Sequence, residues 1–381
     1  MYQRAVIHMD LDSFFVSVER LRNKDLVGKP LIIGGSSQRG VVASCSYEAR
    51  RFGVHSAMPV KMAKYLCPDA IFIRGDMDAY STHSHLVNEV IAEDAPLYEK
   101  ASIDEFYIDI SGMDRYFGCF LWGKELRQKV IRETGLPISF GLAVNKMVSK
   151  VGTGEAKPNG SIQIANGREV EFLHPLSIRK LPGVGKKTAV QLNFMGVRKI
   201  GMLSQVPPAL LKAEFGKNGL KLWEKANGID NSPVEPYTEQ KSMSAEKTFE
   251  SDTLDISQIK RLLAKMTGEL AFELRSIGKM TACVTVKIRY ADFNTFTRQK
   301  KIPLTSSDIK LSEYAGELFD ALYTRRQLIR LIGVKFSHMV AGAQQLSLFE
   351  DHSKEVKLLN QMDLIRKKFG KTAVQRANWV G

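Results

Sequence analysis

The chain has 381 residues, more than one hydrophobic core usually holds, so we expect two to four domains. Apolar residues make up 44% of the chain, as in ordinary globular proteins, and no apolar run reaches the roughly 18 residues of a membrane span. The first residues read as a strand rather than a signal peptide, so we expect a cytoplasmic protein without a membrane partner. The four cysteines form no CxxC pair, which argues against a zinc site or a disulfide framework.

The formal net charge of +14 is distributed unevenly along the chain. Residues 1–165 hold 20 basic and 19 acidic residues, a net charge of +1, whereas residues 166–381 hold 35 and 22, a net charge of +13. An acid-bearing, nearly neutral part joined to a basic part is typical of a protein that grips a polyanion with one region and processes it with the other. A merely basic, soluble surface is the alternative interpretation.

Strands and helices alternate over the first 165 residues. Strands are predicted at 4–10, 31–34, 40–44, 106–110 and 138–143, and helices at 12–21, 46–54, 58–66, 76–94, 117–134 and 145–155. Asp12 or Ser13 would serve as the N-cap of the first helix. Because this alternation lacks a Gly-rich phosphate fingerprint, it favours an α+β fold over a Rossmann sheet.

The rest of the chain divides into three further regions. Residues 166–230 are short helices punctuated by LPGVG and FGKNG, and residues 231–241 carry two prolines typical of a linker. Beyond them, strands are predicted at 244–250, 281–290, 293–302 and 331–338, and helices at 255–277 and 308–326. This β-α-β-β-α-β order predicts a compact two-layer domain. The tail, 342–381, begins loose and ends in an amphipathic helix.

Three acids lie at or near strand ends. Asp10 ends the first predicted strand, and Asp104 and Glu105 are adjacent within the β-prone run ASIDEFYIDIS. Burying unpartnered carboxylates is costly, whereas oxygen ligands suit Mg²⁺ or Mn²⁺ better than zinc. Two such ions can activate an attacking oxygen and stabilise a leaving one during phosphoryl transfer. The alternative is that the adjacent acids are salt-bridged on the surface and that Asp12 only caps a helix.

A second group of residues suits phosphate. Tyr47 and Arg50 lie three residues apart and so share a helix face, and a phenol and a guanidinium both bind phosphate oxygens. Lys157 stands just before a chain turn in AKPNG. Taken singly, each of these residues is as easily explained as a solvated side chain.

Four motifs in chain order resemble those of the Y-family translesion DNA polymerases, of the bacterial DNA polymerase IV type. They are DLDSFFVSVE (10–19), SYEARRFGV (46–54), SIDE (102–105) and KPNG (157–160). The resemblance covers residues 1 to about 341 and implies an α+β right hand. Its parts would be a palm (1–11 and 75–165), small fingers (12–74), a helical thumb (166–230), a linker (231–241), a little finger (242–341) and a tail (342–381).

The resemblance also implies roles for single residues. Asp10, Asp104 and Glu105 would be the catalytic carboxylates, holding two Mg²⁺ ions (or Mn²⁺ in their place) with the Leu11 carbonyl. The incoming deoxynucleoside triphosphate would be held by Ser44, Tyr47, Arg50 and Lys157, together with N–H groups near 13–15 at a helix start. Phe15 would be the steric gate against a ribose 2′-hydroxyl, while Phe14 is interpreted as core packing. The implied activity is template-directed, low-fidelity DNA synthesis past damaged bases, with release of pyrophosphate and without proofreading.

Contacts with primer-template DNA are expected in two places. IRKLPGVGKKTAVQL (178–192) resembles a helix-hairpin-helix in which Gly183 and Gly185 form a tight turn beside Lys186 and Lys187. The basic strand faces of 281–302 would track phosphates without reading bases. Their candidate residues are Lys287, Arg289, Arg298 and Lys300.

The tail contains QQLSLFE (344–350), which resembles the peptide by which bacterial polymerases bind the sliding clamp. Its candidate contacts are Gln345, Leu346, Leu348 and Phe349. The alternative is a tail strand folded onto its own protein. In many family members this peptide is terminal, whereas here residues 350–381 follow it, and their helical pattern allows packing on the body or on another partner.

Two other functions compete with a polymerase that is expected to be monomeric. A DNA-binding and clamp-binding accessory protein with an inactive palm would lack some of the three acids, yet all three are present. A nucleotidyl cyclase can share palm-like carboxylates but would need neither the hairpin nor the basic sheet domain.

Overall fold

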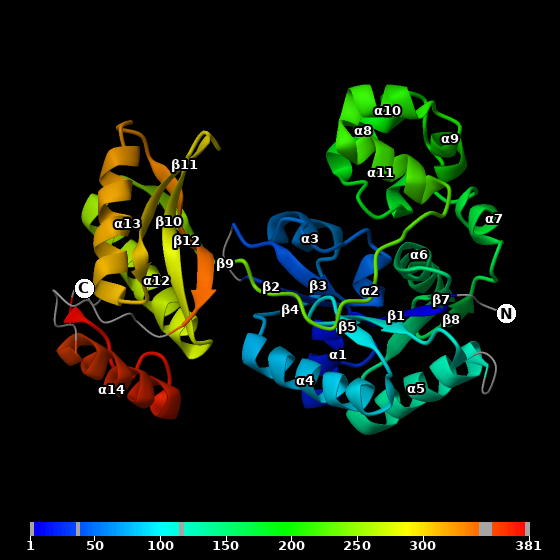
Figure 1. Ribbon diagram of the computed structural model, residues 1–381, viewed down its shortest axis with the longest axis horizontal. Coiled ribbons are helices and arrows are strands. Elements are labelled where there is room, and N and C mark those ends of the chain that lie inside the picture. Colours follow the sequence, from blue (N-terminus) through cyan, green and yellow to red (C-terminus); the bar gives the residue numbers. More distant parts are fainter. Residues whose placement is uncertain (1–3, 36–38, 114–117, 343–352, 378–381) are drawn as a thin grey trace. The chain divides into compact units, whose positions relative to one another are not determined.

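The computed structural model describes residues 4–35, 39–113, 118–342 and 353–377 (Figure 1). It divides into two compact units, Met1–Thr238 and Glu239–Gly381. Within the described residues, none of the helices has the length and apolar content needed to span a membrane.

The first unit is built on a five-stranded sheet that brings the chain's first strand to its centre. The strand order is β5 (Tyr98–Lys100), β6 (Glu105–Asp109), β1 (Val6–Leu11), β7 (Ile138–Ala143) and β8 (Ser161–Gln163). Neighbours are antiparallel except β7 and β8. Every residue of β1 is buried except Asp10, which is partly exposed. The central strand is therefore core along its length and presents one acid near its end.

Helices cover both faces of this sheet (Figure 1). On one face α4 (Met77–Asp94) packs against α5 (Cys119–Thr134), and on the other α6 (Lys146–Ala156) packs on β7 and β1. Gly141 permits this close approach, because a Cβ there would lie 2.4 Å from the Ser149 carbonyl oxygen. Helix α1 (Phe14–Arg22) follows β1 directly. The predicted helices and strands of this region are confirmed, with bounds that differ by a few residues.

A smaller sheet lies between β1 and α4 in the sequence. Its order is β3 (Val42–Cys45), β2 (Leu31–Gly34) and β4 (Ile71–Ile73), with η1 (Lys24–Leu26), α2 (Tyr47–Arg50) and α3 (Val60–Leu66) around it. Strands β2 and β3, both predicted from the sequence, pair antiparallel. Strand β4 was not predicted, because three residues are too few for a periodic signal.

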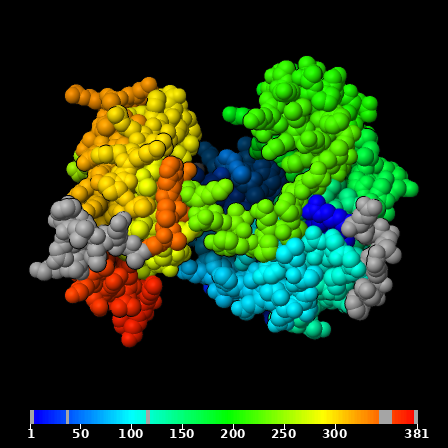
Figure 2. Space-filling view, in the orientation of Figure 1, coloured from blue at the N-terminus to red at the C-terminus, as the bar shows by residue number. Residues whose placement is uncertain are grey.

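Residues 166–230 are helical and form a lobe of their own (Figure 2). The helices are α7 (Glu169–Leu173), η3 (Ile178–Lys180), α8 (Lys186–Phe194), α9 (Ile200–Ser204), α10 (Pro208–Phe215) and α11 (Lys217–Ala226). The segment after them is less independent than a linker suggests. Val234 is buried against Val6 and Tyr107, and Arg4 donates to the Ser232 carbonyl. The first half of the predicted linker is therefore packed on the first unit.

The second unit is a four-stranded antiparallel sheet in the order β11 (Thr295–Thr305), β10 (Lys279–Tyr290), β12 (Ile329–Ala341) and β9 (Ser242–Thr253). Helices α12 (Ile256–Ser276) and α13 (Asp308–Leu322) lie on one face of it (Figure 1). Val284, Val286 and Ile288 of β10 are buried in the core with these helices. The predicted β-α-β-β-α-β order is confirmed.

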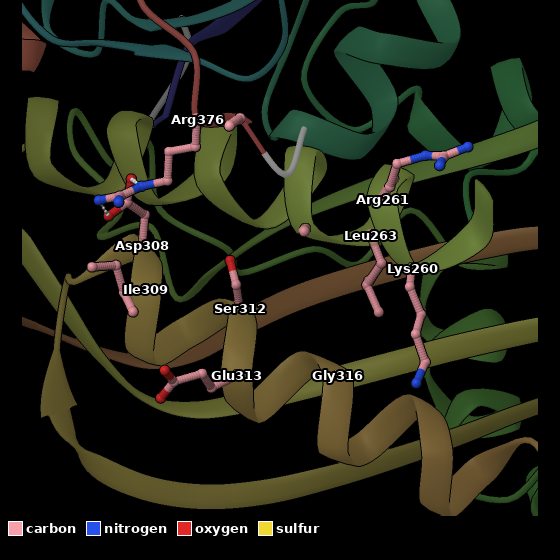
Figure 3. Close-up of a pocket in the computed structure, with 11 residues that line it drawn as sticks. Lys260, Arg261, Leu263, Asp308, Ile309, Ser312, Glu313, Gly316 and Arg376 are labelled. Carbon is pink, nitrogen blue, oxygen red and sulfur yellow. Dashed lines mark hydrogen bonds and ion pairs between the residues drawn. The ribbon is translucent and has the colours of Figure 1, made fainter. Parts of the chain in front are cut away.

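The C-terminal helix α14 (Ser353–Phe369) packs on the second unit. Leu359 and Met362 are buried, and Asp363 accepts two hydrogen bonds from Arg275 of α12, at 2.6 and 2.9 Å. Farther on, Arg376 donates to both carboxylate oxygens of Asp308 at the start of α13 (Figure 3). Of the two possibilities for this segment, packing on the protein's own body is the observed one.

Candidate active site

The three candidate carboxylates meet at one end of the five-stranded sheet. In the β1–β6 ladder Asp10 lies opposite Glu105, and the Leu11 amide donates to the Asp104 carbonyl at 3.1 Å. Asp104 precedes β6 rather than lying inside a strand. The Ser102 hydroxyl holds it there, donating to its carboxylate at 2.6 Å and accepting from its amide. Pairing of two adjacent strands thus brings together acids that are far apart in sequence.

Two lysines neutralise these carboxylates. Lys157 Nζ lies 2.5 Å from Asp10 Oδ1 and 3.3 Å from the Leu11 carbonyl oxygen. Lys150 Nζ donates to both oxygens of Glu105 at 2.7 Å. Among the described residues, no group of three or more acidic, histidine or cysteine side chains is close enough to hold a metal ion. Asp10 and Glu105 therefore each have a lysine ammonium group as their cationic partner.

Burial dominates the electrostatics of the site. It raises the pKa of Asp10 to about 6, an effect reinforced by Asp104 and Glu105 and opposed by Lys157. The pKa of His8, which lies on the same strand, is held well below its ordinary value by burial and by the neighbouring lysines. His8 is therefore a neutral neighbour of the acids, and its Nδ1 lies 2.9 Å from the Thr153 hydroxyl.

A cavity of about 180 Å³ opens beside the acids. Besides Ser13, Phe14, Ala43 and Ser56, it is lined by the predicted site residues Asp10, Leu11, Phe15, Ser44, Arg50, Asp104 and Lys157. Tyr47 lies next to it, with the Arg50 guanidinium 4.8 Å from its ring centroid. Burial and the Asp12 carboxylate raise the pKa of the Tyr47 phenol to about 12, so the hydroxyl is a hydrogen-bond donor at neutral pH.

Phe14 and Phe15 divide as the sequence suggested. Both rings border the cavity, but Phe14 is buried in the core, whereas Phe15 is partly exposed. Phe15 stacks on Tyr80, with ring centroids 4.2 Å apart and planes 10° from parallel, and the Tyr80 hydroxyl donates to Glu19 at 2.7 Å. Sequence reasoning missed Tyr80, because a buried tyrosine on a helix carries no local signal of a functional neighbour.

Of the two predicted N-caps of the first helix, Ser13 holds the position, but its side chain does not cap the helix. Ser13 occupies the N-cap position in a left-handed conformation (φ 45°) without a side-chain capping bond to the described residues. The Asp12 side chain is buried and turned elsewhere, toward Ser139, Asn159 and Tyr47. Asp12 is therefore not the helix cap that the sequence suggested.

The predicted hairpin forms an exposed turn at the start of α8. Gly183 has φ 101°, a conformation that favours glycine, and Gly185 is the N-cap of α8. Lys186 and Lys187 follow in the exposed first turn. Backbone N–H groups and two ammonium groups thus face solvent together.

The four candidate cations of the second sheet do not share a face. Lys287 and Arg289 lie on the face not covered by helices; Lys287 is paired with Glu246, and Arg289 donates to Thr295. Arg298 and Lys300 lie opposite buried residues of β10 and contact α13 instead, through the Ala321 carbonyl and Glu317. The expectation of a common basic surface therefore holds only for Lys287 and Arg289.

The open face of β11 carries other side chains than those expected. Cross-strand pairing with β10 places Thr297, Gln299 and Lys301 there. The predicted clamp contacts Gln345, Leu346, Leu348 and Phe349 lie outside the residues that the structure describes.

Comparison with known proteins decides the family. Family models match in chain order: the impB/mucB/samB family over residues 9–154, the thumb domain of DNA polymerase iota over 179–230, and the impB/mucB/samB family C-terminal domain over 240–348. A DNA polymerase IV from Dehalococcoides mccartyi is 39% identical over 376 residues, which cover 98% of this chain and 96% of the relative. The chain belongs to the Y-family DNA polymerases.

Other relatives and solved structures support the same family assignment. A DNA polymerase IV from Streptococcus pyogenes is 35% identical over 91% of this chain and 96% of its own length. Among solved structures, a Y-family DNA polymerase chimera matches with a TM-score of 0.78 and 27% identity, and DinB from Sulfolobus solfataricus matches with 0.61 and 28%. Each match covers 89% of this chain and 100% of the solved one. This protein is thus a DNA-directed DNA polymerase of the DNA polymerase IV type, with the predicted right-hand α+β fold.

Proposed function

We propose that this polymerase extends primers past damaged template bases by two-metal nucleotidyl transfer at Asp10, Asp104 and Glu105. The observation that carries the proposal is the meeting of these acids at the end of two paired strands, where Asp10 and Asp104 line a cavity together with Arg50, Lys157 and Phe15. An accessory protein with an inactive palm would have no use for this combination.

The donor atoms available at the site fit hard divalent cations. Three carboxylates and the Leu11 carbonyl provide oxygen ligands alone, which Mg²⁺ prefers and Mn²⁺ accepts. Lys157 and Lys150 now neutralise Asp10 and Glu105, so positive charge is already favourable at those oxygens. When bound, the cations supply charge neutralisation of the triphosphate and activation of the primer hydroxyl.

The chain's own side chains bind and orient the nucleotide. Arg50 and Lys157 line the cavity and present cations to the triphosphate, and the Ser44 hydroxyl adds a donor. The Tyr47 hydroxyl, which donates to Asp12 at 3.3 Å, would exchange that acceptor for a phosphate oxygen. The first N–H groups of α1 have no acceptor within their own helix and suit a phosphate. Phe15, backed by Tyr80, leaves too little room for a ribose 2′-hydroxyl. Catalysis then rests on positioning and on charge complementarity.

Primer-template DNA is held through its backbone. The hairpin at Gly183 and Gly185, with Lys186 and Lys187, suits a phosphate, and Lys287 and Arg289 add cations on the little finger's open face. Recruitment by the sliding clamp would use Gln345, Leu346, Leu348 and Phe349. Low fidelity, absence of proofreading, a monomeric state, the domain boundaries and a cytoplasmic location remain predictions from the sequence.

The experiment that tests the proposal is primer extension by the purified protein on two templates, one undamaged and one with a single abasic site. Extension past the abasic site with Mg²⁺, abolished by a chelator and restored by Mg²⁺ or Mn²⁺, is the expected result. Extension that stops before the lesion while the undamaged template is copied would contradict translesion synthesis. Extension that survives the chelator would contradict the metal assignment.

A further inference from the structure

Asp12 is a buried carboxylate beside the active site for which the proposed chemistry has no use. It follows β1 directly and is only 2% exposed. Its backbone is anchored at both ends, because its amide donates to the Pro137 carbonyl at 2.8 Å and its carbonyl accepts from the Ser17 hydroxyl at 2.7 Å. Burying a carboxylate costs free energy, so we looked for the contacts that offset this cost.

All contacts of this carboxylate are with hydrogen-bond donors from three distant segments. Ser139 Oγ, on β7, lies 3.0 and 2.9 Å from its two oxygens. The Asn159 amide donates at 2.8 Å, and the Tyr47 hydroxyl donates at 3.3 Å. Asp12 thus joins the palm sheet to the KPNG turn and to α2.

The KPNG turn carries Lys157, which lies 2.5 Å from Asp10 Oδ1. The turn is pinned on its far side, because Asn159 donates to Asp12 and the Gly160 amide donates to Ser139 Oγ at 3.1 Å. Only glycine fits at position 160, since a Cβ there would lie 2.0 Å from the Ala156 carbonyl oxygen. Together with Arg127, which donates to the Asn159 carbonyl at 2.7 Å, the Asp12–Ser139 pair holds the turn that carries Lys157.

The third contact is with Tyr47 of α2. Its hydroxyl points at Asp12, and the Arg50 guanidinium lies over its ring. One carboxylate therefore touches two of the segments to which triphosphate ligands are assigned, the α2 segment and the KPNG turn.

We propose that Asp12 is a positioning residue for nucleotide binding: through the KPNG turn, it holds Lys157 where a triphosphate can reach it. This inference rests on the proposed function, in which Lys157 binds that triphosphate. Asp12 touches neither the nucleotide nor the reacting atoms. Its effect is therefore on the nucleotide's KM and not directly on the chemical step.

The test is single-nucleotide incorporation by full-length Asp12→Asn. An amide keeps the shape of the side chain but removes its negative charge and leaves one acceptor oxygen, so the charge-assisted bonds that hold the KPNG turn are weakened. The KM for the deoxynucleotide should rise about tenfold, which corresponds to one lost hydrogen bond to a charged group, while kcat changes little. Ser139→Ala, which removes the bridge to Gly160, should shift KM in the same direction by less.

Asp308→Asn is the matched control. Asp308 is also a fully buried carboxylate held by several donor atoms, but it pairs with Arg376 in the second unit (Figure 3). It should lower the thermal midpoint and leave KM unchanged. If Asp12→Asn and Asp308→Asn alter KM equally for equal losses of thermal stability, Asp12 is merely structural and the inference is wrong.

The double variant Asp12→Asn/Lys157→Ala separates this inference from the proposed function. If Asp12 acts largely through Lys157, the double variant should have nearly the KM of Lys157→Ala alone. If Lys157→Ala raises KM but neither Asp12→Asn nor Ser139→Ala does, the inference fails and the triphosphate site stands. If Lys157→Ala itself leaves KM unchanged, the triphosphate assignment falls and the inference with it.

Discussion

The carboxylate end of the palm sheet and the open face of the little-finger sheet both carry charged residues, yet they hold them differently. In the palm, Asp10 and Glu105 are 18% and 23% exposed and each meets a lysine within 2.7 Å. On the little finger, Lys287 and its partner Glu246 are 33% and 37% exposed. Shielded charges interact strongly and depend on exact neighbours, whereas exposed pairs are screened by salt and contribute little.

The comparison teaches that the palm site depends on the exact placement of single side chains. The open face of the little finger depends on its total positive charge. Around Asp10, single atoms are held by strand pairing and by buried hydrogen bonds. On the open sheet face, each cation can leave a surface acid for a phosphate at low cost, because the starting pair is weak. Single substitutions should therefore have large effects in the palm and small, graded effects on the little finger.

The largest effect is expected at the carboxylates. Asp104→Asn or Glu105→Gln should reduce the rate of primer extension about a thousandfold or more, because each removes charge where the phosphoryl group is transferred. Duplex binding should be nearly unchanged, since the hairpin and the little finger are untouched. Extension kinetics and DNA titration on the same preparations measure both; near-wild-type extension by both variants would refute the assignment.

The proposed recruitment by the sliding clamp would use a segment that belongs to neither region. Replacing Leu348 and Phe349 together with Ala should abolish clamp-stimulated synthesis, since each buried apolar side chain contributes about 1.5–3 kcal/mol to the clamp contact. Basal extension of a short primer should be unaffected. The measurement is a titration of the cognate clamp on a primed circular template. Equal stimulation of both proteins would mean that another segment binds the clamp.

Sugar discrimination should change without loss of synthesis in Phe15→Ala. Relief of a clash of about 1–3 kcal/mol would raise relative ribonucleotide incorporation by about 5- to 150-fold. Phe14→Ala is the matched control, because the neighbouring ring is buried in the core and its loss should destabilise the fold by about 3–5 kcal/mol without altering sugar choice. The measurement is single-nucleotide incorporation of ribonucleotides and deoxynucleotides by each variant. Unchanged selectivity in Phe15→Ala would mean that the Phe15 ring only packs against its neighbours.

The smallest effect is expected on the open sheet face. Lys287→Ala with Arg289→Ala should weaken binding to unrelated duplexes alike and reduce the slope of log affinity against log salt by up to about two. Arg298→Ala with Lys300→Ala removes the same charge from residues engaged with α13 and should change the slope less. The measurement is the DNA affinity of both double variants over a range of salt concentrations. Equal slopes would mean that DNA binding depends on net charge alone and not on which sheet face carries the cations.

The sequence by itself determined the element order of the palm and pointed to its candidate site residues. A periodic pattern in α4 and apolar, β-prone runs in β1 and β7 predicted these elements with nearly their observed bounds. The proposed acids, tyrosine, arginine and lysine were identified because their motifs are local in sequence. Three-residue strands such as β4 and β8 were missed because they are too short to show a period.

Only the tertiary structure decided what depends on register and on distant neighbours. The β10–β11 register turned Arg298 and Lys300 toward α13, although their positive charges looked equivalent to that of Lys287 in the sequence. Asp12, expected to cap a helix, instead accepts hydrogen bonds from β7, the KPNG turn and α2 and so links these three segments. The physical reason is common to both: local patterns report which face of an element is apolar, whereas the partner of a given side chain is set by which strands and turns pack against it, often more than a hundred residues away.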